Sequence, residues 1–214
     1  MNILIKLKNT IPFLILLSYH IAVAENTNDL IQKIQHNLKN LDKAAIEFLQ
    51  TAPNSSVATG KLLIQRPSFF RCNYYPPYPL LIVGGKEYIS MYDYSMETIS
   101  YIRAKDNIMN LLFSADFSKY FKILATVETA KHVALKLMFE ENQQILEAFF
   151  DNKSFDLARI VFVELDGASI VIEFAKPVMV KKFKKKLFEM RDPKIFNAPR
   201  HLNKQELEQE YELD

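Results

Sequence analysis

The chain has 214 residues, with 27 Lys and Arg against 25 Asp and Glu, and a formal net charge of +2. This near-neutral balance gives no electrostatic basis for binding nucleic acid, so we expect no nucleic-acid partner. One cysteine, Cys72, excludes an internal disulfide. The four glycines form no phosphate-binding loop, which excludes the usual nucleotide sites.

The N-terminus predicts an export signal. Lys6 and Lys8 precede a mostly apolar stretch at 11–21, and Ala22-Val23-Ala24 follows with small residues where a signal peptidase reads. This pattern is typical of a secretory signal peptide spanning 1–24 and cut before Glu25. The alternative is an uncleaved membrane anchor, but the apolar run is shorter than the roughly 20 residues of a spanning helix. We therefore expect a single exported domain at 25–214.

Removing Lys6 and Lys8 with the signal leaves 25 basic side chains against 25 acidic ones.

An amphipathic helix is predicted next, with Thr27 or Asn28 as its cap. Its apolar residues recur at spacings of three and four: Leu30, Ile31, Ile34, Leu38 and Leu41. Such a stripe packs on a core, or it covers a cavity from which it can be displaced.

The pattern then changes to alternation. A strand is predicted at 45–51, and the stretch 60–75 is typical of two strands joined at Arg66-Pro67. In these two strands, Leu62 and Ile64 share one face, as do Phe70, Cys72 and Tyr74. A lone thiol in such a row is expected to be buried and inert.

Further short strands are predicted at 80–83, 88–92 and 96–102, with a tight turn of positive φ at Gly84-Gly85. A short helix carrying Ile108, Leu111 and Leu112 is expected after Asp106-Asn107, and 116–121 adds one more turn.

Four strands are predicted in the second half, at 133–139, 146–150, 158–164 and 169–174, with a hairpin at Asp166-Gly167. Residues 203–214 are interpreted as a polar tail, either a frayed helix or a loose end. The predicted fold class is α+β, mainly antiparallel β: a strongly curved sheet, or incomplete barrel, whose concave face is covered by two helical segments.

A lysine-rich run, 181–186, has two interpretations. It is a solvated strand end with Phe183 pointing inward, or it is a docking surface for an acidic partner or for anionic phospholipid.

Signals for catalysis are absent. His36, His132 and His201 have no metal-ligand spacing with one another or with Cys72, and no nucleophile elbow occurs. We expect a protein that is not an enzyme and that needs no metal or other cofactor. A hydrolase remains an alternative, because a triad assembles in space rather than in sequence.

The stretch Gly60-x-Leu62-x-x-x-Arg66-Pro67-x-x-Phe70-Arg71 resembles the outer-membrane lipoprotein carrier (LolA) family. The resemblance is best over 45–93 and extends to Leu187-Phe188 and Asp192-Pro193 near the C-terminus. The family commonly has Trp where this chain has Cys72, and the mature chain contains no Trp. The lining of the cavity therefore differs from the family pattern.

The resemblance implies an unclosed antiparallel barrel, an apolar cavity and a helical lid. The arginine of the motif, here Arg66, would hold the lid shut by hydrogen bonds, and Phe70 would lie at the hydrophobic entrance. The alternatives are a surface salt bridge for Arg66 and plain core packing for Phe70. Our hypothesis divides the apolar residues in two. The underside of the lid would comprise Leu30, Ile34, Leu38, Ile108, Leu111 and Leu112, and the sheet face beneath it Leu62, Ile64, Phe70 and Tyr74.

The function implied by the resemblance is that of a monomeric periplasmic chaperone. It would bind the acyl chains of lipoproteins released from the inner membrane and deliver them to the outer membrane. The implied partners are acylated lipoproteins, an ATP-driven inner-membrane transporter and an outer-membrane receptor. Three alternatives remain: a periplasmic binding module for another lipid or amphiphile on the same fold, a secreted hydrolase, and a structural envelope protein with a filled barrel.

Overall fold

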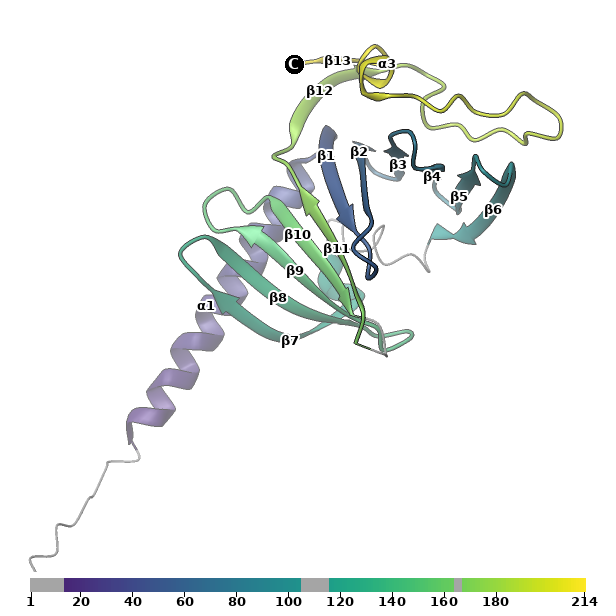
Figure 1. The fold of residues 1–214 in the computed structure, drawn as a ribbon. Coiled ribbons are helices and arrows are strands. Elements are labelled where there is room, and N and C mark those ends of the chain that lie inside the picture. The colour runs from purple at the N-terminus through teal and green to yellow at the C-terminus, as the bar shows by residue number, and fades with distance from the viewer. Residues whose placement is uncertain (1–13, 105–115, 164–166) are drawn as a thin grey trace, which may run out of the picture.

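A computed structural model describes residues 14–104, 116–163 and 167–214, and the side chains from Thr27 onward (Figure 1). The predicted helix carrying Ile108, Leu111 and Leu112 lies outside these residues. Within the described residues, no helix is both long enough and apolar enough to cross a membrane.

The first element is one helix, α1 (Leu14–Asn40). It begins upstream of Thr27 and Asn28, so neither residue caps it in the uncleaved chain. The reason is that the apolar run at 14–24 continues the helix without a break. The predicted stripe is confirmed: Leu30, Ile34 and Leu38 are buried, and Leu41 just beyond the helix is buried with them.

The described residues contribute thirteen strands to one antiparallel sheet (Figure 1). They are β1 (Lys43–Thr51), β2 (Val57–Gln65), β3 (Phe69–Tyr74), β4 (Leu80–Gly84), β5 (Tyr88–Asp93), β6 (Thr98–Arg103), β7 (Phe121–Glu128), β8 (His132–Phe139), β9 (Ile145–Asp151), β10 (Leu157–Val163), β11 (Ser169–Phe174), β12 (Val178–Phe183) and β13 (Tyr211–Leu213). The main path runs β6-β5-β4-β3-β2-β1-β11-β10-β9-β8-β7, while β12 pairs with β1 and β13.

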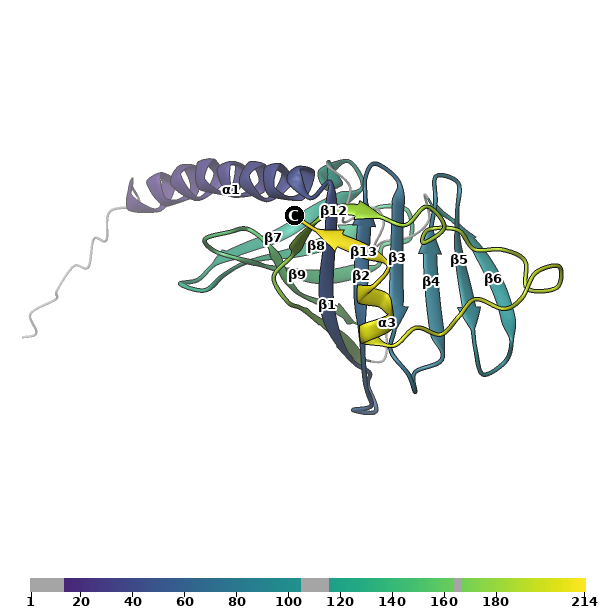
Figure 2. The same cartoon turned by 90° about the horizontal axis from the view of Figure 1, so that it is seen from above.

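The sheet is unclosed and strongly curved, as predicted. Its terminal strands, β6 and β7, are not paired with each other. In Figure 2, β7–β9 run across the direction of β1–β6, so the sheet bends back over its own inner face. The mainly antiparallel class is therefore confirmed, whereas the described residues do not clearly show a helical lid.

Alternation along each strand separates an inner from an outer face. In the pairing of β1 with β2, Ile46 lies opposite Leu62 and Phe48 opposite Gly60 on the inner face. Ala45 lies opposite Leu63 on the outer face. The same alternation explains β8, where Val133, Leu135 and Leu137 are fully buried and the residues between them are not.

One local prediction was wrong, and one strand was missed. Neither Gly84 nor Gly85 has positive φ; Gly84 is the last residue of β4, and its role is steric. Strand β7 was not predicted, because only Phe121 and Ile123 of its first half alternate inward before the register shifts between Ile123 and Ala125. By contrast, Gly167 has a φ of +85°, as its predicted hairpin requires.

The C-terminal segment covers the outer face of β1–β6 (Figure 2). Residues 203–214 are not a loose end. Asn203 caps helix α3 (Lys204–Glu208) in a capping box with Glu206, Leu207 is fully buried, and β13 pairs with β12. The polar composition of 203–214 did not predict this ordered structure. One buried leucine and one N-cap are enough to hold a five-residue helix against the sheet, and they hardly change the composition.

Lys61 joins this segment to the sheet. Its side chain is buried, and its Nζ lies 3.0 Å from Glu47, 2.9 Å from Glu208 and 2.8 Å from the Tyr211 hydroxyl. Burial lowers the pKa of Lys61, but the hydrogen bonds to Tyr211, Glu208 and Glu47 outweigh this and raise the pKa above its ordinary value. The buried charge is thus fully paired.

Candidate functional site: the apolar inner face

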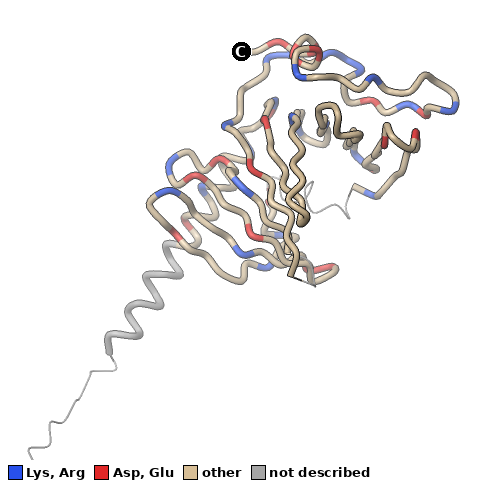
Figure 3. The backbone as a smooth tube through the Cα atoms, viewed as in Figure 1, with Lys and Arg blue, Asp and Glu red and all other residues tan. Residues whose placement is uncertain are grey.

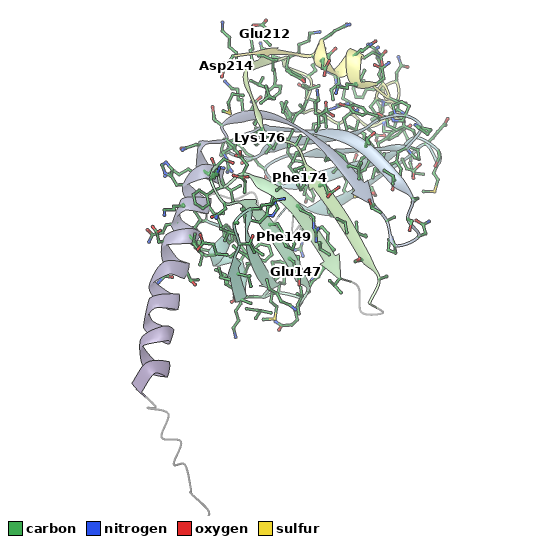
Figure 4. The ribbon with its side chains drawn as sticks, turned by 60° about the vertical axis from the view of Figure 1, so that its left-hand side comes forward. Glu147, Phe149, Phe174, Lys176, Glu212 and Asp214 are labelled. Atoms are coloured by element: carbon green, nitrogen blue, oxygen red, sulfur yellow. The ribbon has the colours of Figure 1, made fainter. Side chains whose placement is uncertain are left out.

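The inner face of the sheet carries two apolar clusters. The first joins α1 to β7–β10 and contains Leu30, Ile34 and Leu38. The second lies on β1–β4 and contains Ile46, Phe48, Ala58, Leu62, Ile64 and Tyr74, with Phe70, Cys72, Leu80 and Ile82 packed against it. Phe174 of β11, labelled in Figure 4, packs against both clusters and connects them across the bend.

This division corrects the predicted arrangement of the site. The stripe of α1 was expected to cover Leu62, Ile64, Phe70 and Tyr74. The structure instead packs the helix on the β7–β10 half of the same face, so the two sets belong to different clusters. The curvature of the sheet determines which half the helix packs on. The alternation of apolar residues in the sequence shows only which face of the sheet a residue occupies.

Arg66 reaches the C-terminal end of α1. Its Nε donates to the carbonyl of Leu41 at 3.1 Å, and Nη2 donates to the carbonyl of Leu38. Burial lowers the pKa of Arg66, while the charge of Asp42 acts in the opposite direction. A cation at the last carbonyls of a helix satisfies them and complements the negative end of the helix dipole. Arg66 therefore connects the Arg-Pro corner to the helix, and its role as a latch stays a prediction.

Two inner-face glycines are covered by aromatic rings from the neighbouring strand. Phe48 lies opposite Gly60, and Phe70 lies opposite Gly84. A Cβ on Gly84 would come within 2.0 Å of the Phe70 ring, and one on Gly60 within 2.5 Å of the Phe48 ring. Neither glycine can therefore carry a side chain unless the ring above it moves. We call the apolar surface that this second cluster forms on β1–β4 the apolar wall.

Tyr74 completes this wall. Its ring packs edge-on against Phe48 with centroids 5.0 Å apart, and its hydroxyl donates to Gln50 Oε1 at 2.7 Å. Burial raises the pKa of Tyr74, so it stays neutral. Burial also raises the pKa of the Cys72 thiol to about 12, opposed by the charge of Arg71, although Cys72 as a whole is partly exposed. A thiol of such high pKa is a poor nucleophile, although the expected full burial of Cys72 is not met.

Sequence reasoning missed the covering role of Phe48 and the buried charges Lys61 and Arg71. The first could have been found by aligning 45–51 with 57–65 as a hairpin, which sets Phe48 opposite Gly60. The charges gave no signal, because their burial depends on the C-terminal segment. Among the described residues, no three His, Cys, Asp or Glu side chains are positioned to hold a metal ion.

The comparisons with known proteins show the family of this chain. The family model described as outer membrane lipoprotein carrier protein LolA matches residues 39–191. An uncharacterized protein of Rickettsia prowazekii (strain Madrid E) is 35% identical over 188 residues, covering 87% of this chain and 88% of that protein. The chain therefore belongs to the LolA family.

The solved structures that this chain matches include a LolA superfamily protein from Nitrosomonas europaea. It has a TM-score of 0.45 and 10% identity, and the match covers 76% of this chain and 97% of that one. The MucA/MucB complex of Pseudomonas aeruginosa matches with a TM-score of 0.45 and 10% identity, over 78% of this chain and 61% of that one. Members of the family generally act as binding or chaperone proteins rather than as enzymes.

Proposed function

We propose that this chain is a periplasmic carrier that binds the acyl chains of lipoproteins released from the inner membrane and delivers them to the outer membrane. The observation that carries the proposal is the apolar wall on the inner face of β1–β4, in a member of the LolA family. Phe70, Cys72 and Ile82 on this wall are only partly buried, so apolar surface is accessible to a ligand.

The energetics suit a carrier. Burying a methylene contributes about 0.8 kcal/mol, so a C16 chain would contribute on the order of 12 kcal/mol if fully covered. A wall that covers one side of the chain recovers only part of this free energy. Partial burial keeps the complex soluble and still permits transfer to a partner with a more complete site.

The partners follow from the proposed role. An ATP-driven transporter in the inner membrane would load the carrier, and a receptor at the outer membrane would accept the lipoprotein. Arg66 would act as the latch, because it connects the strand corner beside the wall to the end of α1. Phe70 would lie at the entrance to the acyl site.

The direct test is binding of a fluorescent palmitoylated peptide to the exported protein. A charge at Ile82, as in Ile82→Glu, should weaken binding at least tenfold, because a carboxylate on an apolar wall would have to be desolvated. Val163→Glu, at a residue 44% exposed on the opposite face, is the matched control and should bind like the wild type. Circular dichroism confirms that both variants are folded. Equal binding by all three proteins would remove the wall from the proposal.

A second experiment separates lipoproteins from other amphiphiles. Depleting the protein in cells should cause acylated proteins to accumulate at the inner membrane. Native mass spectrometry of the protein purified from the periplasm identifies its cargo. A free lipid as the only bound species, with normal lipoprotein sorting, would instead support a lipid-binding module on the same fold.

A further inference from the structure

A second candidate site lies on the outer face, on the opposite side of the sheet from the apolar wall. It is a cleft of about 620 Å³ between Arg71 on β3 and the C-terminal segment. Its lining includes six basic residues, Arg71, Lys184, Lys185, Lys186, Arg191 and Arg200, against two acidic ones, Glu189 and Glu210. Part of this lining lies beyond residue 191, outside the segment that the family model matches.

Arg71 is a buried cation without a carboxylate partner among the described residues. It is 6% exposed. Its Nη1 donates to the Leu187 carbonyl at 3.2 Å and its Nη2 to Asn73 Oδ1 at 2.9 Å, both neutral acceptors. Its Nε has no hydrogen-bond partner within the described part of the chain. Burying a guanidinium in this way is costly unless an anion compensates for it.

Most of the remaining charges of the cleft are paired. Glu189 contacts Arg191, Glu210 contacts Lys184, and Arg200 contacts Glu206. Lys185 and Lys186 have no ion pair within the described ranges. Both acidic residues of the cleft are therefore already engaged, and the surplus charge belongs to Arg71, Lys185 and Lys186. Burial also lowers the pKa of Arg71, an effect opposed by Tyr94, Glu210 and Cys72. An anion bound nearby would relieve this cost.

The loop beside the cleft has an apolar tip. Arg191 and Asn197 both line the cleft, and between them Ile195 is 75% exposed and Phe196 is 48% exposed. The Arg191 guanidinium lies 5.1 Å from the centre of the Phe196 ring. Basic residues recur along this C-terminal segment in Figure 3. Exposed apolar side chains flanked by cations are typical of a surface that meets an anionic membrane.

We propose that this cleft binds the phosphate of an anionic phospholipid head group, with Ile195 and Phe196 entering the lipid surface beside it. The uncompensated charge of the Arg71 guanidinium attracts a phosphate, and the lysines around it add long-range attraction. The contact is independent of acyl-chain binding, because the cleft and the apolar wall lie on opposite faces of the sheet. It would hold the protein transiently at a membrane surface.

The test is flotation of the exported protein with vesicles of phosphatidylcholine alone and of phosphatidylcholine mixed with phosphatidylglycerol. We expect binding to the mixed vesicles only, weakening as salt is added. Replacing Lys185 and Lys186 together by Gln should weaken binding on the order of 25-fold, since each lysine near an anionic surface contributes about fivefold. Replacing Lys122 and Lys131 by Gln removes the same charge elsewhere and should change binding little.

Two further variants separate the parts of the site. Ile195→Ser with Phe196→Ser should reduce vesicle binding without affecting the fold, because both side chains are exposed. Arg71→Met should abolish the preference for phosphatidylglycerol; if this variant does not fold, the lysine variant still decides. Absence of binding to mixed vesicles, equal losses in the two lysine variants, or binding of soluble glycerol 3-phosphate without vesicle binding would each overturn the proposal.

Discussion

At the scale of single residues, the hydrogen bonds of Arg66 connect the sheet to the end of the N-terminal helix. The sequence places Arg66 at a strand corner, and the structure brings its guanidinium to the carbonyl of Leu38, which also accepts from the Leu41 N–H, and to the carbonyl of Leu41 just beyond α1. One side chain thereby satisfies the helix end and links it to β2. The predicted alternative, a surface salt bridge, does not describe these two contacts.

We expect Arg66→Met to lower the free energy of unfolding by about 1–3 kcal/mol, because hydrogen bonds from a charged donor are lost at a helix end. The free energy of unfolding of Arg66→Lys should lie between those of the wild type and Arg66→Met, since an ammonium cannot reproduce the paired donors of a guanidinium. Urea denaturation measures the change, and amide exchange at 30–41 reports the helix itself. Arg159→Met, at an exposed arginine of β10, is the control. An Arg66→Met protein as stable as the wild type would refute a structural role for the contact.

At the scale of elements, the pairing of β3 with β4 depends on a ring and a glycine. Phe70 lies opposite Gly84, and a methyl group there would overlap the ring. At Gly60 the Asn73 carbonyl is also within 2.4 Å of an added Cβ, so backbone as well as side chain blocks that position. The two glycines look alike in the sequence but differ in what they touch.

This difference predicts opposite responses to a second mutation. Gly84→Ala should destabilise the protein by about 1–3 kcal/mol, as overpacking does, and Phe70→Leu in the same chain should restore part of that loss. Gly60→Ala should not be rescued by Phe48→Leu, because the Asn73 carbonyl cannot move aside without breaking the ladder. Thermal unfolding of the four variants tests this. Rescue at both positions would show that side chains alone set the spacing.

At the scale of the whole molecule, α1 is part of the core. Ile34 and Leu38 have no exposed surface, and Leu30 and Leu41 retain 5% and 6%. Burial of four such side chains contributes about 6–12 kcal/mol, which is comparable with the entire stability of an ordinary domain. Complete displacement of the helix would therefore nearly unfold the protein, so opening at the proposed Arg66 latch would have to leave most of α1 packed on β7–β10. A ligand is better accommodated on the β1–β4 half of the inner face.

The corresponding prediction compares neighbouring positions on α1. Ile34→Ala should cost about 2–5 kcal/mol in unfolding free energy, whereas Ile31→Ala, at a partly buried residue of the same helix, should cost distinctly less. The matched pair removes the same atoms with the same change in helix propensity. Denaturant titration measures the free energy of unfolding of both variants. A small and equal effect at both sites would indicate a helix that is held loosely, as a displaceable lid would be.

The sequence alone determined much of the architecture, because alternation and turn chemistry are local. The strands around 62–64 and 70–74, the stripe of α1 and the turn at Gly167 all depend on residues within a few positions of one another. The family motif around Arg66 and Phe70 is equally local, which is why the family could be predicted from the chain.

Only the tertiary structure decided which half of the sheet each apolar row serves. Whether the stripe of α1 faces β7–β10 or β1–β4 depends on how far the sheet bends, and no spacing in the chain encodes that angle. The order of residues 203–214 and the burial of Lys61 and Arg71 also arise from contacts between segments more than 100 residues apart. Such contacts depend on the summed packing of the whole chain, so local patterns do not predict them.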